Sequence, residues 1–145
     1  MTDDQQEFTG EPKEATSTTS FFELIRFDAD GLVAGIVQDV ETDAVLMMAW
    51  MDRAAVENTI RTGETHFWSR SRKSSWHKGG TSGHVQKVES IRVDCDGDTL
   101  LIRARQIGGA CHEGYLSCFS RELDESGQWR RIAKTVFDPQ KVYER

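Results

Sequence analysis

The sequence predicts an α+β fold, mostly antiparallel β-sheet with one or two short helices. Short segments in which apolar and polar residues alternate recur along the chain, as strands with one buried face require. One stretch of about ten residues has instead the start and stop signals of a helix. The chain has 145 residues, of which 37% are hydrophobic, so one compact domain with a single core is expected.

The first two expected strands form a hairpin. Residues 32–40 and 44–50 are apolar segments of strand length, and the polar residues 41–43 between them favour a turn. The other strands are expected after a helix, with the basic, glycine-rich segment among them as a loop. These strands are residues 65–71, 87–95, 99–107, 115–123 and 128–136.

The helix is expected over residues 53–62. Asp52 can cap its first turn, and Gly63 stands where a left-handed residue often ends a helix. Val56 and Ile60 are four positions apart and therefore share one face of this helix. Local signals thus define both of its ends.

The two ends of the chain are expected to lie outside the domain. Residues 1–20 are mostly polar or acidic, with Phe8 as the one large apolar residue after Met1, so we expect a disordered acidic tail. Residues 21–137 then form the folded domain and residues 138–145 a C-terminal tail. Neither the apolar run of a secretory signal nor that of a membrane span is present, which predicts a cytoplasmic protein.

The net charge of −6 hides a basic segment in the middle of the chain. Residues 61–92 carry seven basic and two acidic residues, whereas residues 1–30 carry two basic and eight acidic ones. Serine, threonine and glycine surround the basic residues, a composition suited to binding phosphate through charge and backbone N–H groups. A solvated basic loop is the alternative. The basic residues of this loop are Arg70, Arg72, Lys73 and Lys78.

The stretch VDCDGDTL places three aspartates beside one turn. In an extended strand, Asp94 and Asp96 would point away from the face of Cys95. Gly97 permits a tight turn, through which Asp98 can approach the other two carboxylates. Three crowded carboxylates suit a hard divalent cation, and an ordinary acidic turn is the alternative.

The three cysteines also permit two interpretations. Cys95, Cys111 and Cys118 include no C-x-x-C pair, so a structural zinc finger is not expected. Three thiolates without a fourth protein ligand would leave one zinc position for water, whose pKa zinc lowers to about 7. The alternative is three small buried hydrophobic residues, a common role of free cysteine.

Several separated motifs together resemble one enzyme family. The motifs are VLMMAWMDR, HFWSRSR, W-x-K-G-x-TSGHVQ, DCDGDTLL and GGACHEGYLSCF. In this order and spacing they are similar to the phosphoribosyl-AMP cyclohydrolase family of histidine biosynthesis, from about Gly31 to Arg121. The resemblance implies an intertwined homodimer that hydrolyses the N1–C6 bond of the adenine ring of N1-(5-phosphoribosyl)-AMP.

The resemblance also implies a site, with zinc ligands drawn from both subunits. The implied zinc ligands are Cys95, Cys111 and Cys118. The implied magnesium ligands are Asp94, Asp96 and Asp98. Attack of zinc-activated hydroxide on C6 requires proton transfers, for which His112 is the first candidate and His84 the second. The residues expected against the substrate's phosphates are Arg70, Arg72, Lys78, Thr81, Ser82 and Gly83.

One position departs from the family motif, and two other classes compete with this prediction. The motif usually reads K-G-E-T-S-G-H, but Gly80 stands in place of the glutamate, so either Glu113 takes its role or turnover is reduced. A zinc nucleoside deaminase is disfavoured because its H-x-E and P-C-x-x-C signatures are absent. A noncatalytic nucleotide- or RNA-binding module would explain the basic loop with Trp68 and Trp76, but not the cysteines and aspartates. No nucleic-acid or membrane partner is expected.

Overall fold

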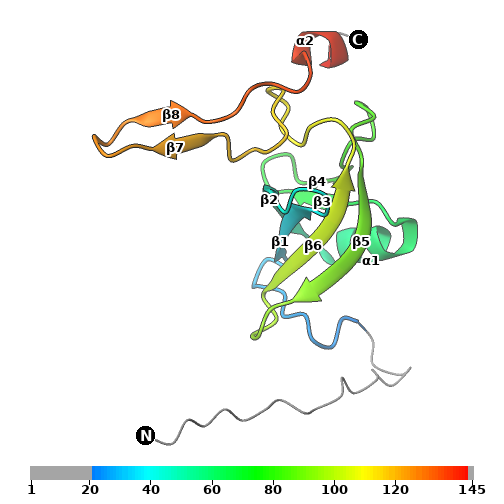
Figure 1. Ribbon diagram of the computed structural model, residues 1–145. Helices are drawn as coiled ribbons and strands as arrows, with labels where there is room; N and C mark the ends of the chain where they lie inside the picture. The colour runs from blue at the N-terminus through cyan, green and yellow to red at the C-terminus, as the bar shows by residue number, and fades with distance from the viewer. Residues whose placement is uncertain (1–20, 144–145) are drawn as a thin grey trace, which may run out of the picture.

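The structure is a computed structural model that describes residues 21–143 (Figure 1). The tail expected over residues 1–20 lies outside the described residues. The elements of the described part are β1 (Val33–Asp39), β2 (Val45–Met51), α1 (Arg53–Thr62), β3 (His66–Ser69), β4 (Ser74–His77), β5 (Gln86–Val93), β6 (Thr99–Gln106), β7 (Arg121–Leu123), β8 (Trp129–Arg131) and α2 (Pro139–Tyr143). Within residues 21–143, no helix is long and apolar enough to cross a membrane.

Six strands form one mixed sheet in the order β4-β3-β2-β1-β6-β5, and β7 and β8 form a separate ribbon. Four of the five pairings in the large sheet are antiparallel, whereas β1 and β6 run parallel, with Val37 opposite Ile102. The predicted class, mostly strands with two short helices, is confirmed. The sheet is therefore mixed at its centre, and the long stretch of chain between β1 and β6 provides the crossover that parallel neighbours require.

Local turn chemistry explains the hairpin of β1 and β2. The buried carboxylate of Asp39 accepts hydrogen bonds from the backbone N–H of Thr42 at 3.2 Å and from its hydroxyl at 2.7 Å. Asp43 adopts a left-handed conformation with φ of 61°, which aspartate tolerates better than most residues. The turn expected at residues 41–43 is therefore confirmed.

Helix α1 has both predicted caps and packs against β2 and β3. Asp52 accepts a hydrogen bond from the N–H of Ala55 at 2.8 Å, and Gly63 ends the helix with φ of 74°. Val56 is buried against the sheet, whereas Ile60 one turn later is 42% exposed. Burial of each large core side chain contributes about 1.5–3 kcal/mol. The largest buried apolar side chains are Phe67, Leu46, Met51, Leu100 and Ile102.

Two predicted strands are wrong over most of their length. Residues 115–123 form a strand only at β7, and residues 128–136 only at β8. The backbone before β7 closes on itself instead, since the N–H of Ala110 donates to the carbonyl of Leu116 at 2.9 Å. A third correction concerns the basic segment expected to be a loop, which contains β4, paired with β3.

The ribbon of β7 and β8 projects from the domain as an arm, defined here as residues 119–132 (Figure 1). Asp124 stabilises the turn at its tip. The carboxylate accepts hydrogen bonds from the backbone N–H groups of Ser126 and Gln128, both at 2.9 Å, and pairs with Arg130. These contacts hold the two short strands together.

The same contacts, above all that with Arg130, lower the pKa of Asp124 from 3.8 to about 2. Because the pKa falls on folding, the stabilisation is complete above pH 3.8 and is lost as the pH falls toward 2. We expect the carboxyl ¹³C shift of Asp124 to titrate near pH 2, and the midpoint to rise toward 3.8 in Arg130→Ala. An identical midpoint in both proteins would contradict this assignment.

Candidate active site

A cavity of about 1500 Å³ lies against β2, β3 and β4. Residues 78–82 after β4, parts of the loop 110–118 after β6, and the start of α2 also line it. Pockets that bind drug-sized ligands typically measure about 300–1,000 Å³, so this cavity is large enough for a nucleotide with two phosphates. The predicted site residues on its wall are Arg70, Arg72, Lys78, Thr81, Ser82, His112 and Cys118.

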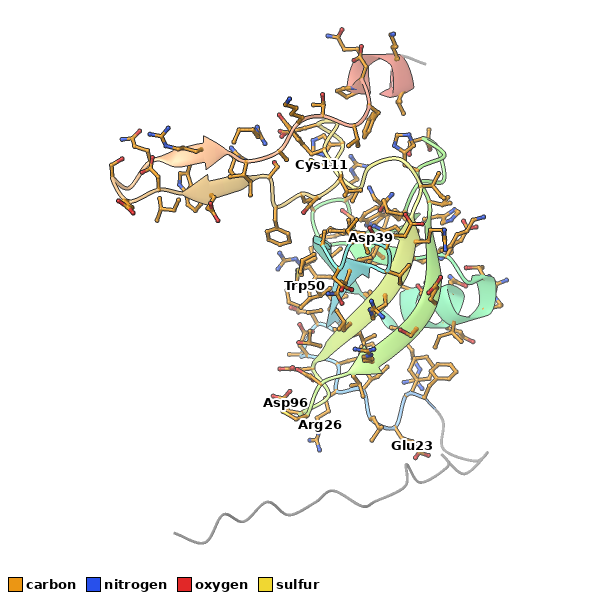
Figure 2. The ribbon with its side chains drawn as sticks, viewed as in Figure 1. Glu23, Arg26, Asp39, Trp50, Asp96 and Cys111 are labelled. Carbon is orange, nitrogen blue, oxygen red and sulfur yellow. The ribbon has the colours of Figure 1, made fainter. Side chains whose placement is uncertain are left out.

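Aromatic and backbone contacts hold the two arginines on the cavity wall. The guanidinium of Arg70 lies over the ring of Trp50, 4.8 Å from its centroid; Trp50 is labelled in Figure 2. The backbone N–H of Arg72 donates to Ser69 Oγ at 3.2 Å. Both arginines are exposed, so their guanidinium groups are available to bind phosphate in bidentate fashion.

Lys78 differs from the arginines because its ammonium group turns inward. Its Nζ donates a hydrogen bond to the carbonyl oxygen of Ala110 at 2.5 Å. Burial lowers the pKa of Lys78, while the nearby thiols of Cys118 and Cys111 oppose this by favouring the charged form. Lys78 therefore connects the basic segment to the loop that carries two of the cysteines.

Cys111 and Cys118 lie together beside this lysine. The N–H of Cys118 donates to the carbonyl of Leu46 at 2.7 Å, which holds the loop against β2. Cys111 is buried, and Cys118 is exposed on the cavity side. Partial burial of its thiol raises the pKa of Cys118 to about 11; Cys111 adds to the rise and Lys78 opposes it. A bound cation would favour the thiolate forms here.

The two histidines predicted to move protons have different surroundings. His112 is exposed and lines the cavity together with Cys118. His84 does not line it; its ring meets that of Phe137 edge to face at 4.4 Å, and a Cβ at Gly108 would lie 2.6 Å from it. Nδ1 of His84 is buried without a hydrogen-bond partner among the described residues. The geometry therefore favours His112 as the residue that meets a ligand.

The three aspartates gather in the turn between β5 and β6. One carboxylate oxygen from each of Asp94, Asp96 and Asp98 lies within 4.8 Å of the others. Because β5 ends at Val93, these residues belong to a turn, and the strand alternation expected for them was wrong. Hydrogen bonds with Asp94, and next with Asp96, raise the pKa of Asp98. A divalent cation would relieve this crowding of carboxylates.

Cys95 shares that turn and is therefore far from the other two cysteines. Strand β6 has eight residues and so spans about 26 Å. Figure 2 shows Asp96 and Cys111 beyond opposite ends of this strand. Within residues 21–143, no group of three or more potential metal ligands includes a cysteine. The three thiols do not meet within one chain.

The sequence prediction missed part of the cavity wall. Trp50 was not assigned to the site, and Pro139 and Gln140 were assigned to a tail, yet all three line the cavity. The tryptophans could have indicated this wall from the sequence, because Trp50 and Trp68 occur in consecutive expected strand segments, which form the neighbouring strands β2 and β3, and Trp76 stands on β4 beside them. No sequence signal pointed to the α2 residues.

Two further predicted positions lie apart from the wall. Gly83 does not line the cavity; its N–H donates to the carbonyl of Gly79 at 2.9 Å. Glu113, expected as one substitute for a glutamate at position 80, is half-exposed, with a carboxylate oxygen 3.9 Å from the guanidinium of Arg131. Neither residue contributes to the cavity surface.

Comparison with known proteins gives consistent matches. The sequence model of the Phosphoribosyl-AMP cyclohydrolase family matches residues 47–120. The phosphoribosyl-AMP cyclohydrolase of Pelotomaculum thermopropionicum is 55% identical over 119 residues, covering 82% of this chain and 92% of the relative. Those of Salinibacter ruber and Methanosarcina barkeri are 55% and 53% identical, over 81% and 83% of this chain and 92% and 93% of the relatives.

These matches define the class of protein: an enzyme, and a hydrolase of the kind that acts on a phosphorylated small molecule. The matched segment includes every predicted site residue, from Arg70 to Cys118. The chain belongs to the phosphoribosyl-AMP cyclohydrolase family. The resemblance inferred from the motifs is thereby confirmed.

Proposed function

We propose that the chain hydrolyses the N1–C6 bond of the adenine ring of N1-(5-phosphoribosyl)-AMP, with zinc and magnesium as cofactors. Family membership supports cyclohydrolase activity in histidine biosynthesis. One observation carries the finer proposal: Arg70, Arg72 and Lys78 line the same cavity as His112 and Cys118. Cationic donors for phosphate and candidate groups for hydrolysis therefore occupy one space.

The chain's own residues suit this substrate. Arg70 and Arg72 bind phosphate oxygens, and the hydroxyls of Thr81 and Ser82 add neutral donors. Trp50 and Trp68 pair across β2 and β3 and favour stacking of a purine, worth about 1–3 kcal/mol per base in nucleic-acid sites, whereas Trp76 packs on Phe67. Alkylation at N1 leaves the ring cationic, so C6 is open to attack by water. Breaking the C6–N1 bond then requires a proton on N1, which His112 is placed to deliver.

The donor chemistry fits both metals. Zinc prefers thiolate and imidazole ligands, and the adjacent thiols of Cys111 and Cys118 offer two of them. Magnesium prefers oxygen ligands, and the cluster of Asp94, Asp96 and Asp98 offers three. Zinc with an open position, when bound, supplies a Lewis acid that brings the pKa of water to about 7.

A homodimer that shares this metal site explains the position of Cys95. Its thiol is about the length of β6 away from Cys111, so a zinc site with all three cysteines needs a second protomer. The arm supports such pairing, because exposed apolar side chains on a projecting element favour burial against another chain. They are Phe119, Leu123, Trp129 and Ile132, each more than half exposed.

Ring opening can be followed by the ultraviolet spectrum of phosphoribosyl-AMP incubated with the purified protein. We expect a spectral change that disappears after chelation and returns when zinc and magnesium are both restored, because each ion has its own ligand set. Elemental analysis of the same samples tests metal content separately. Binding of the nucleotide without chelator-sensitive turnover would contradict the proposal and support a noncatalytic binding module.

A further inference from the structure

Among the described residues that line the cavity, none is an aspartate or a glutamate. Its charged groups are Arg70, Arg72 and Lys78, which only donate hydrogen bonds. A ribonucleotide also presents ribose hydroxyls, whose protons need acceptors, and carboxylates commonly fill that role in nucleotide sites. The cavity therefore offers cations for phosphate but no carboxylate of its own for ribose.

His77 lies between the cavity and the carboxylate of Glu64. His77 lines the cavity and Glu64 does not, while Nε2 of His77 lies 2.8 Å from Oε1 of Glu64. A carboxylate oxygen only accepts hydrogen bonds, so Nε2 carries the proton. When the ring is neutral, Nδ1 is then an acceptor.

Two further contacts keep this ring in one orientation. His77 stacks on His66 of the neighbouring strand β3, with 4.5 Å between ring centroids and 9° between planes. Nδ1 of His66 in turn donates to the backbone carbonyl of Glu64 at 2.9 Å. The side chain of His77 is 38% exposed, so the ring is held from behind and still reaches the cavity.

The acceptor nitrogen faces Gly80, which also lines the cavity. A Cβ atom at Gly80 would lie 3.0 Å from Nδ1 of His77, closer than ordinary van der Waals contact. The N–H of Gly80 donates to the carbonyl oxygen of His77 at 3.0 Å, which keeps the two residues adjacent. Because position 80 has no side chain, this side of Nδ1 has no Cβ against it.

We propose that His77 is a substrate-contacting residue whose Nδ1 accepts a hydrogen bond from a ribose hydroxyl, and that Glu64 is a positioning residue acting through it. The inference rests on the proposed function, in that the cavity is taken as the substrate site. Gly80 then has a role of its own, which is to leave the acceptor open.

Two substitutions at position 77 distinguish loss of the hydrogen-bond acceptor Nδ1 from loss of the ring's packing on His66. His77→Asn keeps an acceptor near the place of Nδ1 but does not reach Glu64, whereas His77→Gln reaches toward Glu64 without an acceptor at that place. Both lose the stack on His66, so each controls for the other. We expect KM for phosphoribosyl-AMP to rise about tenfold in H77Q, the loss of roughly one hydrogen bond. In H77N the rise should stay below about threefold, with kcat of both variants within about twofold of wild type.

Gly80→Ala tests the same contact independently, because its methyl group would cover Nδ1. It should raise KM about as much as H77Q does, and the double variant should be about as impaired as either single one. Equal KM values for H77Q and H77N, or additive effects of H77Q and G80A, would overturn the proposal.

The failure of the proposed function is distinguishable from the failure of this inference. If the wild-type protein shows no turnover, the proposed function fails, and calorimetric affinity for AMP becomes the measurement. Weaker AMP binding by H77Q than by H77N then supports the contact with His77, and equal affinities overturn it. If the wild type turns over, the KM comparison decides.

Discussion

A mixture of the Cys95→Ser and Cys111→Ser variants should regain cyclohydrolase activity that neither variant has alone. Each variant by itself should lose zinc and, on the order of a thousandfold, kcat, because two thiolates hold the ion poorly. In a symmetric dimer with sites between subunits, a mixed dimer carries both substitutions at one site and neither at the other. Random exchange makes half of the dimers mixed, so about a quarter of the wild-type sites should return.

The matched control is a mixture of Cys111→Ser with Cys118→Ser. Both residues lie on one loop of one protomer, so every site of a mixed dimer still lacks a thiolate. No activity should return in this mixture. Zinc content, measured on dimers separated by gel filtration, should follow activity in both experiments. Recovery in both mixtures, or in neither, would contradict a site shared between subunits.

The helix and the first hairpin could be predicted because their signals are local. Asp52 and Gly63 cap the two ends of α1 through contacts within one helical turn. Asp43 lies in the turn that joins β1 to β2, and its conformation depends on neighbouring residues. The parallel pairing of β1 with β6 could not be predicted in this way. It joins Val37 to Ile102, 65 positions later, and depends on packing of the whole sheet rather than on any local pattern.

The candidate site could be predicted by residue type but not by arrangement. The residue types of Cys95, Cys111 and Cys118 permitted a zinc site, and the family resemblance implied one. Neither could reveal that strand β6 separates Cys95 from Cys111. Segment 115–123 alternated like a strand, yet its backbone groups closed a loop that sets Cys118 beside Lys78. Tertiary contacts decided both outcomes.

His112→Ala should lower kcat by about a hundredfold to ten-thousandfold, the usual contribution of a positioned general acid or base. His112 is exposed on the cavity wall that also carries Cys118, so its imidazole can meet the leaving nitrogen N1 of the substrate. KM should change little, because phosphate binding by Arg70 and Arg72 is untouched. Steady-state kinetics with zinc analysis of the same sample separates proton transfer from loss of metal.

His84→Ala is the matched control, since it also removes one imidazole but outside the cavity wall. His84 packs edge to face on Phe137 and fills the space beside Gly108, so its loss should lower the melting temperature and leave kcat within about threefold. His112→Ala is thus expected to change kcat, whereas His84→Ala is expected to change stability. A comparable fall in kcat for both, or near-full activity of His112→Ala with zinc bound, would remove His112 from the chemical step. The proton would then have to reach N1 from another group on the wall.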